Sequence, residues 1–408
     1  MATDSMIIND PVYGFTRIPR GLLCAVIDHP YFQRLGRIRQ LGMASMVYPG
    51  AVHTRKQHSL GAFHLMQEAL RVLMEKGEFL FDAEVEATEV AILLHDVGHG
   101  PYSHVLEQVL TPGVTHEALS LRMMEQMNED LHGELGLAIK VMRGEHPKAF
   151  LHELICSQLD MDRLDYLCRD SFFTGVIEGN IGAARIIKML EVVDDHLAVH
   201  AKGIYTVEHY LMARRLMYWQ VYLHKTAVAA EEMLRSALHR AMELARAGEP
   251  LYASPSLLYF LRRGGERSDL LQDADALHYF ADLDDSDLVS AVKVWRHHED
   301  RVLSLLSAGF VERRLHKAEV FEGEVPDDYV GRIRDSVAAK YGLKPDEVDY
   351  FVRTKVVHKE MYATHSDGIR LVNAAGQTTD VAAVSNIVRG DREGWCDRKT
   401  YLFYPSIA

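Results

Sequence analysis

The spacing of apolar positions predicts helices joined by short loops over the first three quarters of the chain. Between residues 59 and 77 apolar side chains recur every three or four positions, and Gly77 provides a stop. A second helix is expected to open with Asp82 as its N-cap and to end where the glycines and proline of residues 98–101 break the pattern.

A longer helical stretch is expected after Thr206, which is a plausible helix cap. Residues from Val207 to about Ala247 have helical character and almost no Gly or Pro to interrupt them. This stretch is predicted to be one long helix or two abutting ones.

The composition changes near Phe310. Beyond it come short β-branched or aromatic runs. The prediction is therefore a mainly α protein, with a helical body over residues 1–310 and a smaller C-terminal α+β region over residues 311–408. The expected elements of that region are strands within Val348 to Val357, Ile369 to Val372 and Thr400 to Tyr404, and a helix from Asp328 to Tyr341.

Composition and charge narrow the class of protein. The chain is 48% hydrophobic and 25% charged, as soluble globular proteins are, and no run of eighteen apolar residues is present. Its N-terminus lacks the features of a signal peptide, so a cytoplasmic protein without membrane partners is expected. The four cysteines show no CxxC spacing and are expected to be reduced, mostly buried thiols. A net charge of -13 disfavours a nucleic-acid polymer as partner, but not a small polyanion in a local basic pocket.

Histidines and aspartates concentrate in four short elements. Seven of the 22 histidines fall between His53 and His116, six of them in the runs HTRKQHS, LLHDVGHGPYSH and THE, and DMDRLDYLCRD follows later. His95 and Asp96 interrupt an apolar helix in its last turn, where a buried carboxylate without a partner would be costly. Imidazole and carboxylate ligands together suit a catalytic divalent metal with open positions for water and substrate.

The run HDVGH also resembles the zinc protease pattern HExxH. The carboxylate here is Asp, however, and Gly98 and Pro101 end the helix at once. Further His and Asp partners lie outside the run, so a protease is disfavoured.

The series His58, His95-Asp96 and Asp162, with HDVGHGPYSH, resembles the HD phosphohydrolase superfamily and, within it, the deoxynucleoside triphosphate triphosphohydrolases. The likeness covers roughly residues 8–225, with a metal core at about residues 50–230. It implies that His58, His95, Asp96 and Asp162 hold one divalent metal ion: Mn, Fe, Zn, Ni or Mg. Asp96 is expected to be catalytic as well, and His104 and His116 match positions near the phosphates, where one acts as general acid.

The resemblance also implies substrate contacts. Arg163 stands where the family places a lysine on the phosphates, which keeps the charge but changes its geometry. Helix spacing places Asp162, Tyr166 and Asp170 on one face, and Arg214 and Tyr222 on another. The implied phosphate contacts are Arg55, Arg163 and Arg214, and the implied sugar or base contacts are Gln40, Tyr166, Asp170 and Tyr222.

The implied activity is hydrolysis of deoxynucleoside triphosphates to deoxynucleoside and triphosphate by metal-activated water. Two alternatives remain open at this point: another HD phosphohydrolase activity, such as a nucleotidase or phosphodiesterase, and a nucleotide-binding regulatory module without turnover. Complete metal ligands argue against the second alternative.

Nucleotide-activated relatives are oligomers that bind a guanine at a second site. Asn9, Asp28 and Gln33 match that site, but Gly36 stands where those relatives have an arginine. The expectation is a homo-oligomer, a dimer or tetramer, with weak or altered activation by a regulatory guanine nucleotide.

Overall fold

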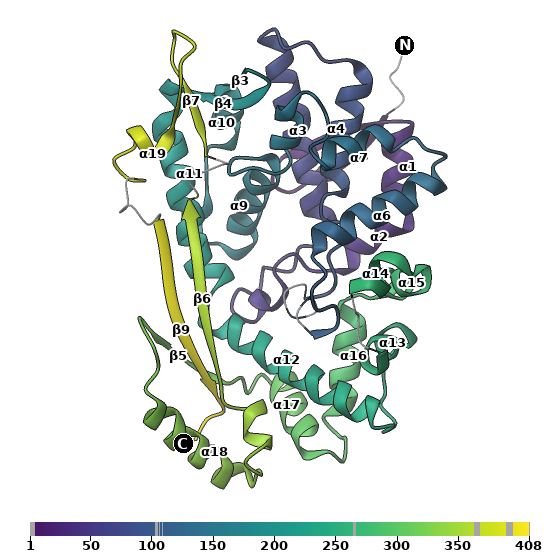
Figure 1. Cartoon of the computed structure of the whole chain (residues 1–408), viewed down its shortest axis with the longest axis vertical. Helices are drawn as coiled ribbons and strands as arrows, with labels where there is room; N and C mark the ends of the chain where they lie inside the picture. Colours follow the sequence, from purple (N-terminus) through teal and green to yellow (C-terminus); the bar gives the residue numbers. More distant parts are fainter. Residues whose placement is uncertain are drawn as a thin grey trace.

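The computed structural model describes residues 5–102, 105, 107, 109–263, 267–362, 368–388 and 395–407. Helices make up most of this part of the chain (Figure 1). Most of the buried apolar side chains belong to one large core cluster. The helices up to residue 311 are α1 (Leu22–Asp28), α2 (Pro30–Gln33), α3 (Arg55–Glu75), α4 (Asp82–Leu94), α6 (His116–Asp130), α7 (Gly136–Met142), α8 (Ala149–Glu153), α9 (Met161–Thr174), α10 (Ala183–Met189), α11 (Ile204–Met217), α12 (Lys225–Arg246), α13 (Pro255–Arg263), α14 (Arg267–Gln272), α15 (Ala274–Asp282), α16 (Asp285–Trp295) and α17 (Arg301–Val311).

Helix α3 starts earlier than its apolar spacing predicts. Thr54 and Gln57 form a capping box, in which the Thr54 side chain accepts from the Gln57 backbone N–H and the Gln57 side chain accepts from the Thr54 backbone N–H. The helix therefore includes His58 in its first turn. It ends at Glu75, close to Gly77, whose φ of +106° is the left-handed conformation that favours glycine.

Helix α4 begins at Asp82, the residue predicted to be its cap. Phe81 is the N-cap, and its backbone N–H donates to the Glu84 carboxylate at 2.9 Å, so the assignment of Asp82 as the cap is wrong. Asp82 and Glu84 instead provide negative charge in the first turn, where the helix dipole favours it. The helix ends at Leu94, and His95 is its C-cap.

The predicted helical stretch after Thr206 consists of two abutting helices. Helix α11 begins at Ile204 with Gly203 as its N-cap, so Thr206 is not the cap; its hydroxyl accepts from Arg185 instead. A π-helical turn, η5 (Tyr218–Tyr222), separates α11 from α12. Such turns shift the side chains that follow them and are frequent at functional sites.

The strands form three small sheets. The first is the hairpin β1-β2, the second has the order β3-β4-β7-β8, and the third has the order β5-β9-β6. Strand β7 pairs in parallel with β4, so strands from before and after residue 310 share one sheet, and the division at residue 310 stays a prediction. The strands are β1 (Ser5–Asp10), β2 (Gly14–Pro19), β3 (Leu190–Val193), β4 (His196–His200), β5 (Lys317–Phe321), β6 (Arg353–Tyr362), β7 (Arg370–Val372), β8 (Thr378–Asp380) and β9 (Trp395–Tyr404).

The C-terminal region has the predicted mixed character. Its main helix α18 (Asp327–Tyr341) ends at Gly342, which has a φ of +62°. The strand expected from Val348 starts only at Arg353, because residues 347–350 form a 3₁₀ turn. Strands β7 and β9 cover the other two predicted runs, and α19 (Val381–Val384) is a single short turn. The predicted fold class, mainly α with a smaller α+β region, is confirmed.

No helix in the described ranges is long and apolar enough to cross a membrane. Cys24, Cys156 and Cys168 are free thiols, as expected. Cys156 is exposed and the other two are only partly buried, so the expectation of mostly buried thiols is wrong for these three.

Candidate metal centre and active site

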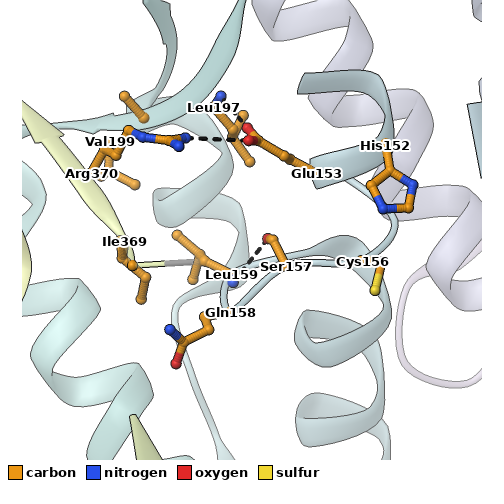
Figure 2. A pocket seen from close by; sticks show the side chains of 12 residues that line it. His152, Glu153, Cys156, Ser157, Gln158, Leu159, Leu197, Val199, Ile369 and Arg370 are labelled. Atoms are coloured by element: carbon orange, nitrogen blue, oxygen red, sulfur yellow. Dashed lines mark hydrogen bonds and ion pairs between the residues drawn. The ribbon is translucent and has the colours of Figure 1, made fainter. Parts of the chain in front are cut away.

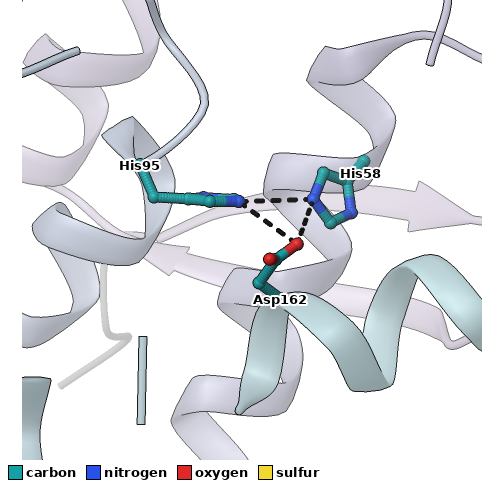
Figure 3. Close-up of side chains that lie close together, drawn as sticks. All are labelled: His58, His95 and Asp162. Carbon is teal, nitrogen blue, oxygen red and sulfur yellow. Dashed lines mark hydrogen bonds and ion pairs between the residues drawn. The ribbon is translucent and has the colours of Figure 1, made fainter. Parts of the chain in front are cut away.

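Three side chains from separate elements converge at the centre of the helical body. His58 comes from the first turn of α3, His95 from the end of α4, and Asp162 from the first turn of α9 (Figure 3). The Nε2 atoms of His58 and His95 are 3.3 Å apart, and Oδ1 of Asp162 lies 3.0 Å and 3.5 Å from them. Ligands about 2.1 Å from one ion lie about 3.0–3.4 Å from each other. The group therefore has the donor types and the spacing of a divalent metal site.

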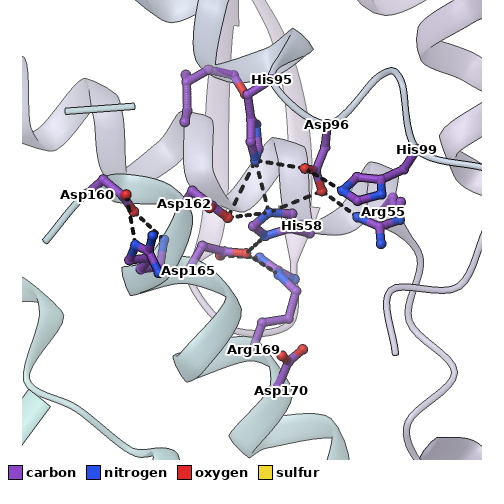
Figure 4. A network of polar contacts seen from close by, with 12 residues as sticks. Arg55, His58, His95, Asp96, His99, Asp160, Asp162, Asp165, Arg169 and Asp170 are labelled. Atoms are coloured by element: carbon purple, nitrogen blue, oxygen red, sulfur yellow. Dashed lines mark hydrogen bonds and ion pairs between the residues drawn. The ribbon is translucent and has the colours of Figure 1, made fainter. Parts of the chain in front are cut away.

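Asp96 lies at the edge of this group. Its carboxylate oxygens are 3.4 Å from Nε2 of His95 and 3.7 Å from Nε2 of His58. Nη1 of Arg55 donates to the same carboxylate at 2.7 Å (Figure 4). Asp96 thus connects the two histidines to a guanidinium group, and it completes a set of two imidazoles and two carboxylates.

Both histidines are oriented through their other ring nitrogen. Nδ1 of His58 lies 2.7 Å from Oδ2 of Asp165, and Nδ1 of His95 lies 2.7 Å from the carbonyl oxygen of Ile92. Each acceptor holds a ring proton on Nδ1, so the Nε2 atom, which a metal ion would use, faces the group. Asp165 is in turn held by two hydrogen bonds from Arg169, at 2.9 Å and 3.0 Å. The residues present therefore fit a metal ion.

The pKa shifts follow from the same contacts. Burial alone would lower the pKa of His58, but hydrogen bonds to Asp162 and Asp165 raise it to about 10. The pKa of Asp162 is lowered, because its bonds to the two histidines outweigh burial. The carboxylates thus remain ionised and attract a positive charge to the centre of the group. A divalent cation bound at this centre would supply that positive charge.

The turn after α4 is held tightly against α6. The Ser120 hydroxyl donates to the His95 carbonyl at 2.7 Å and accepts from the Gly98 N–H at 2.9 Å. A Cβ atom at Gly98 would lie 2.2 Å from the Ser120 backbone nitrogen, so only glycine allows this approach. Arg34 donates to the carbonyl of His99 at 2.7 Å from the other side. These contacts explain why a glycine follows the His-Asp pair.

A second group of ionisable side chains adjoins Asp96. His99 lies 3.3 Å from Asp96, and its ring stacks on that of His116 at 3.8 Å. Nδ1 of His116 is 3.1 Å from the Glu107 carboxylate. The structure therefore connects His116 to the metal group through His99, and His104 lies outside the described residues.

The predicted sugar contacts are joined by hydrogen bonds. The Tyr222 hydroxyl donates to Oδ2 of Asp170 at 2.8 Å, and Nε2 of His53 lies 2.8 Å from Oδ1. The rings of Tyr166 and Tyr222 meet edge to face, with centroids 5.9 Å apart. The backbone N–H of Gln40 donates to the His53 carbonyl at 3.0 Å, which places Gln40 at the same end of the site. The structure brings these predicted residues together.

The predicted phosphate contacts occupy different environments. Arg55 bonds Asp96, as described above, whereas Arg163 directs its Nε to the Ser157 carbonyl at 2.6 Å and to the Asp160 carboxylate at 3.2 Å. Arg214 is 6% exposed, and within the described ranges neither its Nε nor its Nη1 has a hydrogen-bond partner. Its guanidinium group lies over the Tyr218 ring, 5.8 Å from the centroid. Arg214 is therefore a buried cation without a protein counter-ion in this part of the chain.

Three residues of the site were not assigned a role by sequence reasoning. Asp165 orients His58, His53 bonds Asp170, and His99 stacks on His116. Asp165 lies three positions after Asp162 on the inner side of α9, and the two histidines fall within runs already noted for their histidine content. Their partners, however, are distant in the sequence, so their roles depend on the fold.

Gln33 and Gly36, two of the positions matched to a regulatory guanine site, lie near the start of α3. The Gln33 amide donates to the Ile27 carbonyl at 2.7 Å and accepts from Lys56 at 2.8 Å. A Cβ atom at Gly36 would lie 3.5 Å from the Lys56 side chain. Lys56 thus fills space beside Gly36.

A separate cavity of about 260 Å³ lies between the loop that precedes α9 and strands β4 and β7 (Figure 2). Glu153 and Arg370 form an ion pair across it at 3.2 Å. It does not include the metal group.

Comparisons with known proteins agree with this geometry. The HD domain family matches residues 55–170, which contain all four predicted metal ligands, and the HD-associated region matches residues 181–251. The crystal structure of a phosphohydrolase from Bacteroides thetaiotaomicron superposes with a TM-score of 0.95 at 50% sequence identity, covering 99% of this chain and 100% of that one.

Two curated relatives extend the comparison. The uncharacterized protein YwfO of Bacillus subtilis is 32% identical over 320 residues, which cover 77% of this chain and 71% of that protein. The deoxynucleoside triphosphate triphosphohydrolase SAMHD1 homolog of Dictyostelium discoideum is 30% identical over 267 residues, 60% of this chain and 51% of that protein. The predicted resemblance is confirmed, and the chain belongs to the HD-domain phosphohydrolase superfamily.

Proposed function

We propose that this protein is a metal-dependent triphosphohydrolase, which converts deoxynucleoside triphosphates to deoxynucleosides and triphosphate. The observation that carries the proposal is Arg214, a guanidinium group that is 6% exposed. A buried charge without a counter-ion is costly unless a ligand supplies the opposite charge. A polyphosphate tail is such a ligand, and relatives at about 30% identity bear the name deoxynucleoside triphosphate triphosphohydrolase.

In this proposal His58, His95, Asp96 and Asp162 hold the divalent ion. When bound, such an ion supplies Lewis-acid polarisation of a phosphoryl oxygen and makes water a nucleophile near neutral pH. Asp165 and the Ile92 carbonyl keep both imidazoles in the tautomer that a metal requires.

The side chains around the metal group contact different parts of the substrate. Arg55, Arg163 and Arg214 neutralise the phosphates, because guanidinium groups match the geometry of phosphoryl oxygens. Asp170, held between His53 and Tyr222, accepts from the sugar 3′-hydroxyl. Tyr166 and Gln40 complete the sugar and base contacts.

Hydrolysis forms a bond between the water oxygen and the α-phosphorus and breaks the bond from that phosphorus to the 5′-oxygen. The departing 5′-oxygen takes a proton from His116 or His104. His116 suits this role because, although burial lowers its pKa, the hydrogen bond to Glu107 and the nearby Asp96 raise it, so its protonated form persists toward neutral pH.

A substrate screen tests the proposal. The purified protein is loaded in turn with Mn, Mg, Fe, Zn or Ni and given each deoxynucleoside triphosphate, the matching monophosphates and cyclic nucleotides. Release of triphosphate is expected, and in oxygen-18 water the label should appear in the triphosphate. Monophosphate or cyclic-nucleotide hydrolysis alone would establish another HD phosphohydrolase activity. Nucleotide binding without turnover under every metal would establish a regulatory module.

The resemblance also supports a homo-oligomer, a dimer or tetramer, with weak or altered response to guanine nucleotides. The observation that supports the altered guanine response is Lys56, whose ammonium donates to Gln33 and whose side chain packs beside Gly36. Light scattering should give a mass above that of one chain, and GTP should change the rate only slightly. A monomer, or strict GTP dependence, would contradict this part of the proposal.

A further inference from the structure

Strand β6 presents a row of cations toward the helical body. Side chains alternate along a strand, and Arg353, Lys355 and Lys359 lie on one partly buried face, which they share with Val357. The alternate residues Thr354, Val356 and His358 are exposed. The first two cations pair with Glu232 of α12, at 3.7 Å and 3.0 Å. Within the described part of the chain no carboxylate lies at ion-pair distance from Lys359.

Hydrogen bonds hold the third sheet against α11 and η5 next to Lys359. In the ladder between β6 and β9, Lys359 pairs with Asp397. The Asp397 carboxylate accepts two hydrogen bonds from Arg215, at 2.9 Å and 3.1 Å, and one from Nε1 of Trp219 at 2.8 Å. Figure 1 shows β6 and β9 running beside α11. These bonds fix the position of Lys359 relative to the substrate site.

Lys359 and Arg214 share one aromatic ring. Nζ of Lys359 lies 4.3 Å from the centroid of the Tyr218 ring, and Cζ of Arg214 lies 5.8 Å from it. Burial alone would raise the pKa of the Tyr218 hydroxyl, but the charges of Lys359 and Arg214 lower it. Two cations thus meet at Tyr218 and create a strongly positive region.

This positive region is continuous with the proposed substrate site. The rings of Tyr218 and Tyr222 meet edge to face with centroids 5.2 Å apart, and the Tyr222 hydroxyl donates to Asp170. A triphosphate that extends from the metal group past Arg214 would reach the Tyr218 ring with its distal phosphates.

We propose that Lys359 of the C-terminal region is a further substrate-binding residue, which contacts the distal phosphates of a nucleoside triphosphate together with Arg214. The inference rests on the proposed function. A lysine ammonium is a compact charge with three rotatable donors. It can therefore donate hydrogen bonds to a terminal phosphate that a planar guanidinium contacts from one side. The C-terminal region would thereby take part in selecting triphosphates over monophosphates.

Binding of inorganic tripolyphosphate by the full-length protein tests the inference. Lys359→Gln is expected to weaken binding about 10-fold, the effect of one charge-assisted hydrogen bond at a partly exposed site, and to leave orthophosphate binding unchanged. Lys359→Arg should retain most of the affinity. Lys399 is the matched control, because its Nζ also lies 4.3 Å over an aromatic ring, that of Trp219, without Arg214 beside it. Lys399→Gln should bind like the wild type, whereas equal binding by Lys359→Gln would overturn the inference.

A measurement on the wild-type protein removes any dependence on the folding of a variant. Tripolyphosphate should protect Lys359 from acetylation, with Lys399 as the internal reference, and equal modification with and without tripolyphosphate would overturn the inference. The outcomes also separate the two proposals. If the protein hydrolyses no deoxynucleoside triphosphate but binds tripolyphosphate through Lys359, the proposed function fails and the inference stands. If triphosphates are hydrolysed and Lys359→Gln binds tripolyphosphate as tightly as the wild type does, the inference alone fails.

Discussion

Nδ1 of His58 lies 2.7 Å from Oδ2 of Asp165, and both side chains are fully buried. The two residues are 107 positions apart, and they meet because α3 packs against α9. Gly61 makes this packing possible, since a Cβ atom there would lie 2.1 Å from the Asp165 carboxylate. The orientation of a predicted metal ligand thus depends on a carboxylate that is not itself a ligand.

Replacing Asp165 should therefore weaken metal binding without removing a ligand. In Asp165→Asn the amide can present either its oxygen or its NH₂ group to His58, so the imidazole is no longer held in one tautomer. We expect metal affinity to fall about 10- to 100-fold, as for other residues that orient histidine ligands. Titration of the metal-free protein with Mn or Zn measures the change. Unaltered metal affinity would show that Asp165 does not orient His58 and only forms the ion pair with Arg169.

Asp162 and His116 should differ in their effect on metal content. Asp162→Ala removes a proposed anionic ligand, so it should lose both bound metal and turnover. His116→Gln should lose turnover but keep metal, because His116 reaches the metal group only through His99. Elemental analysis of the two variants gives the answer, and metal loss in His116→Gln would mean that the ligand set is misassigned.

Arg214 should matter only for substrates with distal phosphates. A charge-assisted hydrogen bond contributes roughly 1.5–3 kcal/mol, so Arg214→Ala should lower kcat/KM for a deoxynucleoside triphosphate about 10- to 150-fold. Hydrolysis of a monophosphate, if present, should hardly change. Steady-state kinetics on both substrates, with metal content as the control, would decide; an unaffected triphosphate reaction would remove the main support for a triphosphohydrolase.

Gly98 should tolerate no side chain. A Cβ atom there would lie 2.2 Å from a backbone nitrogen of α6, so Gly98→Ala should cost about 3 kcal/mol or more of unfolding free energy. Gly136→Ala is the matched control, since no atom lies within 4 Å of its Cβ and it opens α7; it should be neutral or stabilising by about 0.5 kcal/mol. Denaturant unfolding of both variants measures the contrast. Similar stabilities would mean that the turn after α4 is loosely packed.

The stability of Glu89→Gln should depend on pH relative to the wild type. Burial raises the pKa of Glu89 from 4.5 to about 7, so the folded state binds its proton more tightly than the unfolded state. Stability from this group is complete below pH 4.5 and is lost as pH rises to 7. Glu89→Gln should match the wild type near pH 4.5 and exceed it by on the order of 2–3 kcal/mol above pH 7.5.

Chemical denaturation at several pH values measures this difference. A constant difference between Glu89→Gln and the wild type would show that Glu89 is ionised in the folded protein at neutral pH.

The sequence by itself determined the helical body and the chemical type of the site. The spacing of apolar residues and the glycines that end helices are signals between residues within one or two turns of each other. The bounds of α3 and α18 were therefore predictable to within a few residues. His95-Asp96 was conspicuous because two polar residues follow an apolar helix. Local signals did not distinguish Asp82 from Phe81 as a cap, since the deciding bond is made by the Glu84 side chain.

Only the tertiary structure decided which side chains share a task. Asp170 meets His53 across 117 positions, and Lys359 of the third sheet meets Tyr218 of η5. Neither of these pairings follows from helix or strand spacing, because each depends on how separate elements pack and on the π turn between α11 and α12. Propensity acts over neighbouring residues, whereas the positions of buried charges are set by packing and by the requirement that each find a partner.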